Sequence, residues 1–385
     1  MTPFLDIFQQ QFNKAGEELC GDTVRIGRTA THTILVLSDG LGSGVKANIL
    51  STMTAAILLT MLSADAPLDE TVRTVIGTLP VCQVRKLAYA TFTVVRIDNA
   101  TGYFRVVNFD NPRIVWIKGH ALQTPSRQFQ QVLDHQVAVF DGTLEEGDFL
   151  GILSDGILHA GLGATMNLGW GWDNVASYLE QSLAHYAGNS RGVVQRVMAK
   201  VQQLYSGKIG DDCTLIGLLT RQKRRVTVFT GPPLDRTIDE TIVSYFLSLP
   251  GRHVVCGGTT GNIVARLLDE TPAVVIESIR PDVPPIAELR EIDLMTEGML
   301  TLNKTTEILR STTHPDGVPE DKNGAALLAR ELLNADSIRF IAGQKINDFY
   351  QNPTLPVNLS LRKNLVNEMA RLLKDAGKEV VVEWC

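Results

Sequence analysis

The chain has 385 residues, of which 44% are hydrophobic and 20% are charged, and its formal net charge at pH 7 is −6. One hydrophobic core rarely serves a chain of this length, and the composition is that of a folded protein, so we expect two domains. The acidic balance argues against non-specific binding to nucleic acid, and we expect no nucleic acid among the partners.

The cysteines and the apolar runs bear on the compartment. Five cysteines are scattered along the chain without a Cys-x-x-Cys pair, which predicts a reduced, cytoplasmic protein rather than a disulfide framework. Residues 1–16 mix polar and charged side chains with apolar ones, so we expect no signal peptide. The most apolar helical run, 55–62, is shorter than a membrane span, and we expect no membrane partner.

The first half of the chain predicts strands at short intervals with helices around them. Residues 4–12 have apolar side chains at rough helical spacing, and we expect a short helix that packs on the core, with a partner-docking segment as the alternative. The helix at 45–64 is apolar on nearly all sides and should be buried against a sheet. The other predicted elements of this half are strands at 24–26, 33–37, 90–97, 102–108, 113–118, 136–140, 149–153 and 214–219, and helices from Pro67 and at 174–186 and 191–205.

These elements predict an α+β layered domain, which we place at residues 1–222. The Gly-Trp-Gly-Trp run at 169–172 has two interpretations, a mobile lid or aromatic packing under a loop, and we favour packing. The basic run 221–225 is typical of an exposed linker, and a nucleic-acid patch is the less favoured alternative.

Three acidic sites stand at the ends of predicted strands. One apolar run leads into Asp39, a second leads into Asp155, and Asp211 and Asp212 precede a third. Because a lone buried carboxylate is costly, we expect these acids to converge on a shared partner.

Convergence of carboxylates requires a cation. Two unit charges about 4 Å apart repel by roughly 4 kcal/mol at an effective dielectric constant near 20. A hard divalent ion removes that penalty, and oxygen ligands without a His or Cys cluster favour Mg²⁺ or Mn²⁺ over Zn²⁺. The sequence therefore predicts a magnesium or manganese site.

The second half of the chain alternates strands and helices, which indicates an α/β domain with a mainly parallel sheet at residues 226–385. We expect strands at 226–230, 253–256, 273–276, 293–296, 338–342 and 379–383, and helices at 238–249, 262–268, 325–334 and 361–375.

One loop of this second half stands out as a candidate ligand site. It joins a strand to a helix and consists of Gly257, Gly258, Thr259, Thr260 and Gly261. In a parallel sheet such a loop lies at the carboxyl end of its strand, where the helix amides and dipole favour a small anionic ligand. A tight turn with threonine capping is an equal alternative, because the pattern is neither a Walker loop nor Gly-x-Gly-x-x-Gly. The segment 296–298, ahead of a helix near Leu302, could be a second such loop.

Several short segments carry a family resemblance through their order along the chain. They are Gly21-Asp22, Asp39-Gly40-Leu41-Gly42-Ser43-Gly44, Gly147-Asp148, Ser154-Asp155-Gly156 and Asp211-Asp212-Cys213-Thr214. In this order the sequence resembles the metal-dependent protein phosphatases of the PP2C superfamily, and more closely the bacterial SpoIIE/RsbU-type branch. The resemblance covers roughly residues 17–220 and says nothing about 226–385.

The resemblance implies an αββα sandwich with a two-metal site for Mn²⁺ or Mg²⁺. In that family pattern Asp39 would bridge both ions and the Gly40 carbonyl would bind one of them. Asp155 and Asp211 would hold the other ion. The less certain ligands, direct or through water, would be Asp22 and Asp212. Asp148 would shape a turn rather than bind metal.

This sequence also departs from the family pattern. The branch often carries Asn-Ala-Gly-His-Asn-Pro, which reads Asn108-Phe109-Asp110-Asn111-Pro112 here, so Asp110 or Asn111 replaces the histidine. A phosphate-binding arginine of the animal enzymes has no clear counterpart, and Arg28 is a guess. His159 is a candidate proton donor, with a plain loop histidine as the simpler interpretation.

The resemblance implies a serine/threonine phosphoprotein phosphatase in bacterial signalling, located in the cytoplasm. Its phosphoprotein substrate would be an anti-sigma-factor antagonist or a similar small protein, and no covalent nucleophile is needed. The alternative is a weakly active or inactive sensor or binding protein on a phosphatase fold. In either case residues 226–385 would be a regulatory or ligand-binding domain.

Overall fold

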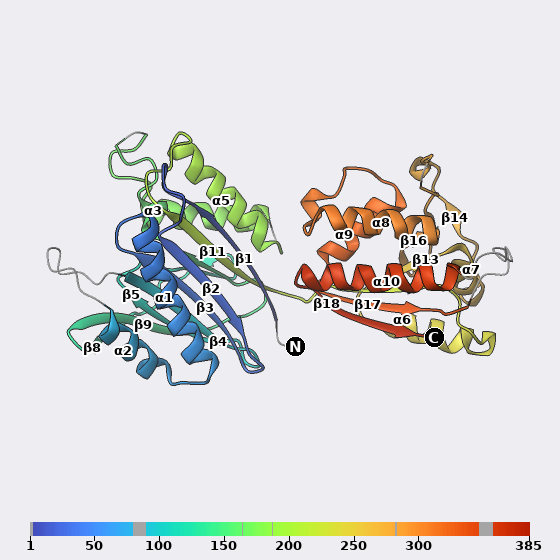
Figure 1. Ribbon diagram of the computed structural model, residues 1–385, viewed down its shortest axis with the longest axis horizontal. Coiled ribbons are helices and arrows are strands. Elements are labelled where there is room, and N and C mark those ends of the chain that lie inside the picture. The colour runs from blue at the N-terminus through green and yellow to red at the C-terminus, as the bar shows by residue number, and fades with distance from the viewer. Residues whose placement is uncertain (1–2, 80–89, 164, 187, 282, 346–356) are drawn as a thin grey trace. The chain divides into compact units, whose positions relative to one another are not determined.

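The computed structural model describes residues 3–79, 90–163, 165–186, 188–281, 283–345 and 357–385 (Figure 1). The chain divides into two compact units, Met1–Gln222 (unit 1) and Lys223–Cys385 (unit 2). The four cysteines among the described residues, Cys20, Cys213, Cys256 and Cys385, are free thiols.

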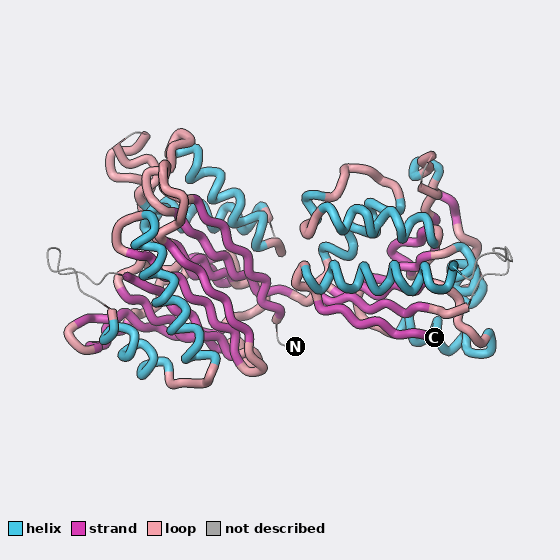
Figure 2. Tube along the Cα trace, in the orientation of Figure 1, coloured by secondary structure: helices cyan, strands magenta, loops and turns pink. Residues whose placement is uncertain are grey.

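Unit 1 contains two antiparallel sheets, and helices cover the outer face of each (Figures 1 and 2). The six-stranded sheet has the order β2 (Asp22–Arg28), β3 (His32–Gly40), β4 (Ala90–Asp98), β5 (Tyr103–Phe109), β9 (His135–Thr143) and β8 (Gln128–Val132). The five-stranded sheet has the order β1 (Phe4–Phe12), β11 (Cys213–Arg221), β10 (Phe149–Leu153), β6 (Val115–Lys118) and β7 (Ala121–Leu122). The helices are α1 (Gly44–Ser63), α2 (Leu68–Thr78), the short α3 (Asp155–Leu158), α4 (Trp172–His185) and α5 (Ser190–Leu204).

Alternating residues of β3 explain why the layers stack. Ile34 and Val36 are fully buried in a cluster with side chains of α1 and α2. Leu35 and Leu37 point the other way, into a cluster with Ile216 and other residues of the five-stranded sheet. A third cluster lies between that sheet and α4 and α5. The result is the αββα sandwich that the family resemblance implies.

Two expectations about unit 1 are wrong. Residues 4–12 form β1, which pairs antiparallel with β11, rather than a helix. Both faces of β1 are packed, since Leu5 and Ile7 contact one core cluster while Phe8 and Phe12 contact another, and an apolar run with two packed faces mimics helical spacing.

Helix α1 lies within one residue of its predicted bounds, but it is less buried than expected. It spans Gly44–Ser63, so the helix that contains the apolar run 55–62 is not too short to span a membrane. It is one helix of the described residues that is long and apolar enough for that. In the fold one face of α1 packs on the six-stranded sheet, as Figure 1 shows. The opposite face leaves Val45, Ile49 and Met53 more than half exposed.

The tryptophan run belongs to the packed core, which confirms the favoured interpretation. Trp170 is buried and its ring centroid lies 5.5 Å from that of Tyr178. The indole N–H of Trp172 donates to the carbonyl oxygen of Arg113 at 2.6 Å, and the Arg113 guanidinium stacks on the same ring.

Unit 2 is a mainly parallel sheet with helices on both faces. Its strand order is β14 (Ala273–Val274), β15 (Ala287–Leu289), β16 (Ile292–Thr296), β13 (Arg252–Cys256), β12 (Arg225–Thr230), β17 (Ser337–Ala342) and β18 (Glu379–Trp384). The five strands from β16 to β18 are parallel, and β14 and β15 add an antiparallel edge. The helices are α6 (Asp239–Ser248), α7 (Gly258–Leu267), α8 (Met299–Ser311), α9 (Gly324–Asn334) and α10 (Val357–Asp375), with 3-10 turns at Arg236–Ile238, Ile276–Ser278 and Pro315–Gly317.

Two hydrophobic clusters fill the faces of this sheet. Side chains of α6 and α7 pack with Phe229 and Val255 on one face. Side chains of α8, α9 and α10 pack with Val228 and Phe340 on the other. The main difference from expectation is that α7 begins at Gly258, so Gly258 to Gly261 form its first turn rather than a loop.

Candidate metal centre

The acidic strand ends of unit 1 meet around one cavity of about 600 Å³. Asp39 ends β3, and Asp22 lies directly opposite it in the antiparallel register of β2 and β3. Asp155 follows β10, and the Asp211-Asp212 pair precedes β11 in the neighbouring sheet. The described residues that line the cavity are Lys14, Asp39, Gly40, Leu41, Gly42, Ser43, Thr91, Asp110, Asn111, Pro112, Asp155, Asp211 and Asp212.

The predicted site residues therefore lie together, with Asp22 immediately behind the lining. Asp155, His159 and Asp211 each offer one ligand atom, and these atoms lie within 4.8 Å of one another. The Nδ1 atom of His159 is 3.9 Å from an oxygen of Asp155. The i, i+4 spacing of Asp155 and His159 is the sequence signal for this cluster. From the sequence we predicted His159 only as a candidate proton donor.

Crowding of the carboxylates raises their proton affinity. Burial, and then the charges of the other four acids, raise the pKa of Asp39 to about 9. Burial also raises the pKa of Asp22 to about 7, against the hydrogen bonds from Thr214 and Ser154 that lower it. The pKa of Asp211 is raised by burial and by the charge of Asp155. Without a cation, the site holds protons that ordinary carboxyl groups would release.

Asp22 has one carboxylate oxygen without a partner. Its Oδ2 atom accepts a hydrogen bond from the Thr214 hydroxyl at 2.6 Å. Its Oδ1 atom is buried and makes no hydrogen bond. Such an orphaned acceptor is costly unless a cation or a water molecule satisfies it.

Asp212 is already engaged by the backbone. One oxygen accepts from the N–H of Lys14 at 3.0 Å and the other from the N–H of Gly21 at 2.9 Å. Asp212 therefore ties the N-terminal segment to the cavity wall. Asp148 lies outside the lining residues, and its side chain accepts from the N–H of Glu145 at 2.8 Å, as expected of a turn residue.

At two positions beside the cavity the neighbouring backbone lies too close for any residue other than glycine. A Cβ atom on Gly40 would lie 2.1 Å from the carbonyl oxygen of Ala47 in α1. A Cβ atom on Gly156 would lie 2.1 Å from the carbonyl oxygen of Asp212. The Asp-Gly dipeptides thus let α1 and the segment before β11 come close to the acidic strand ends.

The residues that replace the family histidine differ in their surroundings. Asn111 accepts a hydrogen bond from the Thr91 hydroxyl and donates to the hydroxyl of Thr93 at 3.3 Å, so it is held by the sheet. Asp110 is exposed at the cavity and has a φ of 55°. Sequence reasoning did not identify Thr91 as a lining residue.

Lys14 is the basic side chain at this cavity among the residues that the structure describes. Its Nζ atom lies 4.0 Å from an oxygen of Asp211. Arg28 is at the other end of β2, where it donates to the carbonyl oxygen of Leu5 at 3.2 Å, so the guess that assigned it to phosphate is wrong.

The predicted ligand residues of unit 2 belong to a different cavity. Gly257, Gly258, Thr259 and Thr260 line a space of about 600 Å³ inside that unit. Gly261 is not among the lining residues, and a Cβ atom there would collide with the Met295 side chain.

Comparison with known proteins gives a family match for unit 1. A family model described as stage II sporulation protein E (SpoIIE) matches residues 29–221. No curated protein matches the sequence.

Solved structures also resemble the chain. The PP2C phosphatase domain of SpoIIE from Bacillus subtilis, with a fragment of its regulatory domain, has 18% identity over 57% of this chain and 64% of that one, with a TM-score of 0.49. The RsbU and RsbW domains of a Mycobacterium tuberculosis protein have 18% identity over 64% and 68%, with a TM-score of 0.48. RsbX in complex with magnesium has 18% identity over 56% and 95%, with a TM-score of 0.41. The chain spans about two thirds of the length of the first two.

Proposed function

The chain belongs to the SpoIIE family, and from this premise we propose that unit 1 is a metal-dependent phosphatase. The observation that carries the proposal is a cluster of aspartates, in which Asp39, Asp155, Asp211 and Asp212 line one cavity and Asp22 lies opposite Asp39. The pKa of Asp39 is raised, and one oxygen of Asp22 has no partner. Each of these features is unfavourable in a protein without a cation.

The donor set fits hard divalent cations. The aspartate oxygens and the Gly40 carbonyl are the ligands that Mg²⁺ and Mn²⁺ prefer. In this proposal Asp39 would be shared by two ions, the Gly40 carbonyl would hold one of them, and Asp155 and Asp211 would hold the other. Asp22 and Asp212 complete the set directly or through water.

The reaction that we propose is hydrolysis of a phosphate ester. When bound, two such ions supply an activated water and stabilise the charge of an in-line displacement at phosphorus. Lys14 places a positive charge at the same cavity, which offsets the negative charge of an incoming phosphate. Asp110 is the exposed lining group that can contact the remainder of the substrate.

We further propose the substrate class from the family. A phosphoserine or phosphothreonine protein in a bacterial signalling pathway, such as an anti-sigma-factor antagonist, would present its phosphate to the cavity. The reaction would take place in the cytoplasm. The alternative, a binding protein that has lost activity, predicts metal binding without turnover.

The test is hydrolysis of p-nitrophenyl phosphate by the full chain. We expect activity with Mn²⁺ or Mg²⁺, loss of activity with EDTA, and recovery when the metal is restored. Asp155→Asn should lose activity, while Asp173→Asn should not, because the Asp173 side chain is 97% exposed and outside the cavity. Full activity after complete metal removal would overturn the proposal. Metal binding without hydrolysis of this ester or of a phosphopeptide would favour the binding protein.

A further inference from the structure

The parallel strands of unit 2 have the order of a nucleotide-binding sheet. Taken along the chain they are β12, β13, β16, β17 and β18, and in the sheet they lie in the order third, second, first, fourth, fifth. The connections change face between β12 and β17, because α6 and α7 cover one face and α8 to α10 cover the other. In such sheets, ligands bind outside the carboxyl ends of the strands, at this switch point.

A cavity of about 600 Å³ lies at those carboxyl ends. Its walls include Gly231 after β12, Gly257 after β13 and Gly298 after β16. The volume is in the range of small-molecule sites.

Two helix N-termini open into this cavity without side-chain caps. Gly257 precedes α7 with a φ of 121°, Gly298 precedes α8, and neither helix has a side-chain cap. The two termini are close, because a Cβ atom on Gly298 would lie 3.4 Å from the Cα atom of Gly257. The helices have 10 and 13 residues, so both dipoles favour an anion in the space between them.

An independent feature, the Thr260 hydroxyl, also points to a ligand. Thr260 is fully buried, lines the cavity, and its Oγ1 atom has no hydrogen-bond partner. It is the third residue of α7, beside the first-turn amides. A ligand oxygen in the cavity would satisfy this hydroxyl and those amides together.

The remaining walls favour a ligand with both an anion and an apolar body. The Arg362 guanidinium is held at the switch point, where it donates to the carbonyl oxygens of Gly343 and Lys345, each at 3.2 Å. Pro284, Pro285 and Leu300 form an apolar wall. The Glu297 carboxylate lies against Gly258, 3.2 Å from the position of an added Cβ atom, and is an acceptor suited to sugar hydroxyls.

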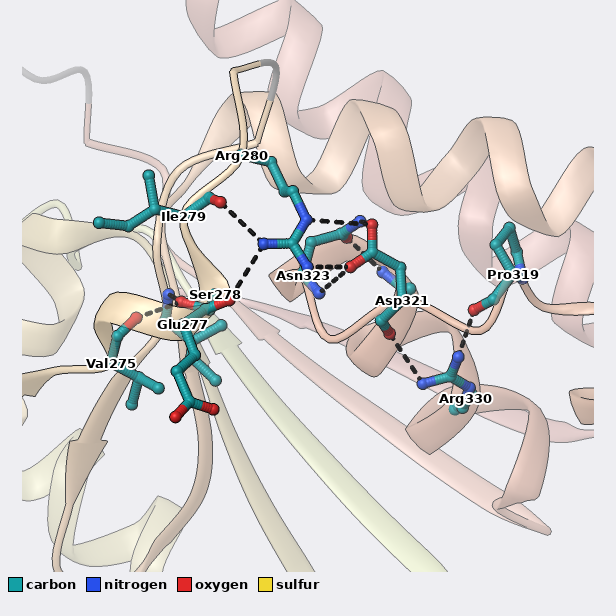
Figure 3. A network of polar contacts seen from close by, with 11 residues as sticks. Val275, Glu277, Ser278, Ile279, Arg280, Pro319, Asp321, Asn323 and Arg330 are labelled. Carbon is teal, nitrogen blue, oxygen red and sulfur yellow. Dashed lines mark hydrogen bonds and ion pairs between the residues drawn. The ribbon is translucent and has the colours of Figure 1, made fainter.

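A polar network fastens residues 275–280, which precede Pro284 and Pro285 in the chain (Figure 3). The Arg280 guanidinium donates to Asp321 at 2.8 Å and to the carbonyl oxygens of Glu277 and Ile279. Asp321 in turn accepts from Asn323, whose side chain caps α9. The N–H of Ile286, just after the two prolines, donates to the Ser278 hydroxyl at 2.9 Å, so this segment is tied to the network by contacts that do not depend on a ligand.

We propose that unit 2 binds a nucleotide in this cavity. Its phosphate lies between the N-termini of α7 and α8, where it accepts from the Thr260 hydroxyl. Its base packs on the proline wall, and its ribose faces Glu297. This site uses no residue of unit 1, so it stands or falls independently of the proposed phosphatase activity.

The experiment compares three variants of the full chain in EDTA, with AMP, ADP, GDP and NAD⁺ as probes and inorganic phosphate and adenosine as half-ligands. Binding is measured by equilibrium dialysis and by thermal unfolding. Thr260→Val should weaken nucleotide binding at least tenfold, whereas Thr260→Ser, which keeps the hydroxyl, should bind normally. Thr301→Val is the matched control, because Thr301 is the third residue of α8, fully buried and also unpartnered, but does not line the cavity.

The variants also separate folding from binding. Because Thr260→Val removes an unpartnered hydroxyl, its unfolding temperature without ligand should equal or exceed that of the wild type. Nucleotide binding that is lost in Thr260→Val and kept in the other two variants supports the proposal. Absence of binding with every nucleotide, binding of phosphate alone with no gain from the nucleoside, or equal binding by Thr260→Val would each overturn it.

Discussion

Asp39 is the carboxylate on which we expect activity to depend most. It ends β3 opposite Asp22 and faces Asp155 and Asp211 across the cavity, which is the position of a shared ligand. Asp39→Asn should therefore reduce phosphatase activity by more than the roughly 10–100-fold that loss of an outer-sphere partner costs. Asp155→Asn and Asp211→Asn should also lose most activity. The measurement is ester hydrolysis across a manganese titration, and near-normal turnover of Asp39→Asn at saturating manganese would show that the role is misassigned.

The same substitution should stabilise the metal-free protein. The pKa of Asp39 is raised to about 9 by burial and by the four neighbouring acids, whereas an unfolded aspartate ionises near pH 4. Between these values the unfolded state has released a proton that the folded state retains, so stability falls as the pH rises. Asn carries no such proton. In EDTA, Asp39→Asn should raise the unfolding temperature at pH 8 by about 2 °C or more.

The pH dependence of the unfolding temperature tests whether Asp39→Asn stabilises the metal-free protein for this electrostatic reason. The difference between Asp39→Asn and the wild type should grow from pH 5 to pH 9 in thermal unfolding with EDTA. Saturating manganese should reduce or reverse it, because only the wild type keeps the full ligand set. A variant that is less stable than the wild type in EDTA at pH 8 would contradict the electrostatic account.

The residues of the metal centre were predictable to different degrees. The acids could be found because a continuous apolar run that ends in Asp-Gly is visible along the chain, as at Asp39 and Asp155. Lys14 and Thr91 could not, because their positions at the cavity depend on contacts with residues far away in the sequence. Thr260 could be named from its glycine- and threonine-rich segment, but the lack of a hydrogen-bond partner for its hydroxyl is a property of the packed unit.

At the scale of elements, burial on one face or two decided which predictions succeeded. Buried strands such as β3 and β10 gave short apolar runs that predicted them well. β1 failed because both of its faces are packed and its apolar residues mimic a helix. The bounds of α1 were predicted well but its burial was overestimated, since it is apolar all round although only one face is covered.

The contact between β3 and α1 gives a prediction about an element rather than a ligand. A Cβ atom on Gly40 would lie 2.1 Å from the Ala47 carbonyl oxygen, so Gly40→Ala must push the first turns of α1 away from the strand end. We expect a loss of about 1–3 kcal/mol in the free energy of unfolding, as for other overpacked sites. Phosphatase activity should fall as well, because the loop between β3 and α1 lines the cavity.

A second glycine serves as the control for this substitution. Gly77 lies within α2, has ordinary helical φ, and an added Cβ atom would meet only the end of the Leu133 side chain, at 3.3 Å. Gly77→Ala should leave activity unchanged and alter stability by no more than about 1 kcal/mol, in the stabilising direction if Leu133 shifts. Urea unfolding of both variants makes the comparison. If the two variants have equal free energies of unfolding, α1 can move away from the end of β3 without a loss of stability.

At the scale of the whole molecule, each unit has its own hydrophobic core. Three buried clusters belong to unit 1 and two belong to unit 2. Two charges of the basic run 221–225 pair within their own unit, since Arg221 contacts Asp6 at 3.1 Å and Lys223 contacts Glu379. The run thus has a partner on each side of the boundary between residues 222 and 223.

Independent cores predict independent folding. A fragment of residues 1–222 should fold and keep the metal-dependent phosphatase activity, and a fragment of residues 223–385 should fold and keep the nucleotide binding proposed above. In the full chain, a nucleotide should raise the unfolding temperature of one transition only, because ligand binding stabilises the unit that binds. The measurements are circular dichroism, calorimetry and the two functional assays on each fragment.

The control for this prediction is a fragment cut ten residues earlier, at residue 212, which removes β11. That strand is paired on both sides, with β1 and with β10, so its loss leaves β1 without a partner and β10 with β6 alone. It also removes Ile216 and Leu218 from the cluster between the sheets. The fragment 1–212 should therefore fail to unfold cooperatively. If 1–222 is also unfolded, or if 1–212 folds and hydrolyses the ester, the boundary between the units is not where their cores place it.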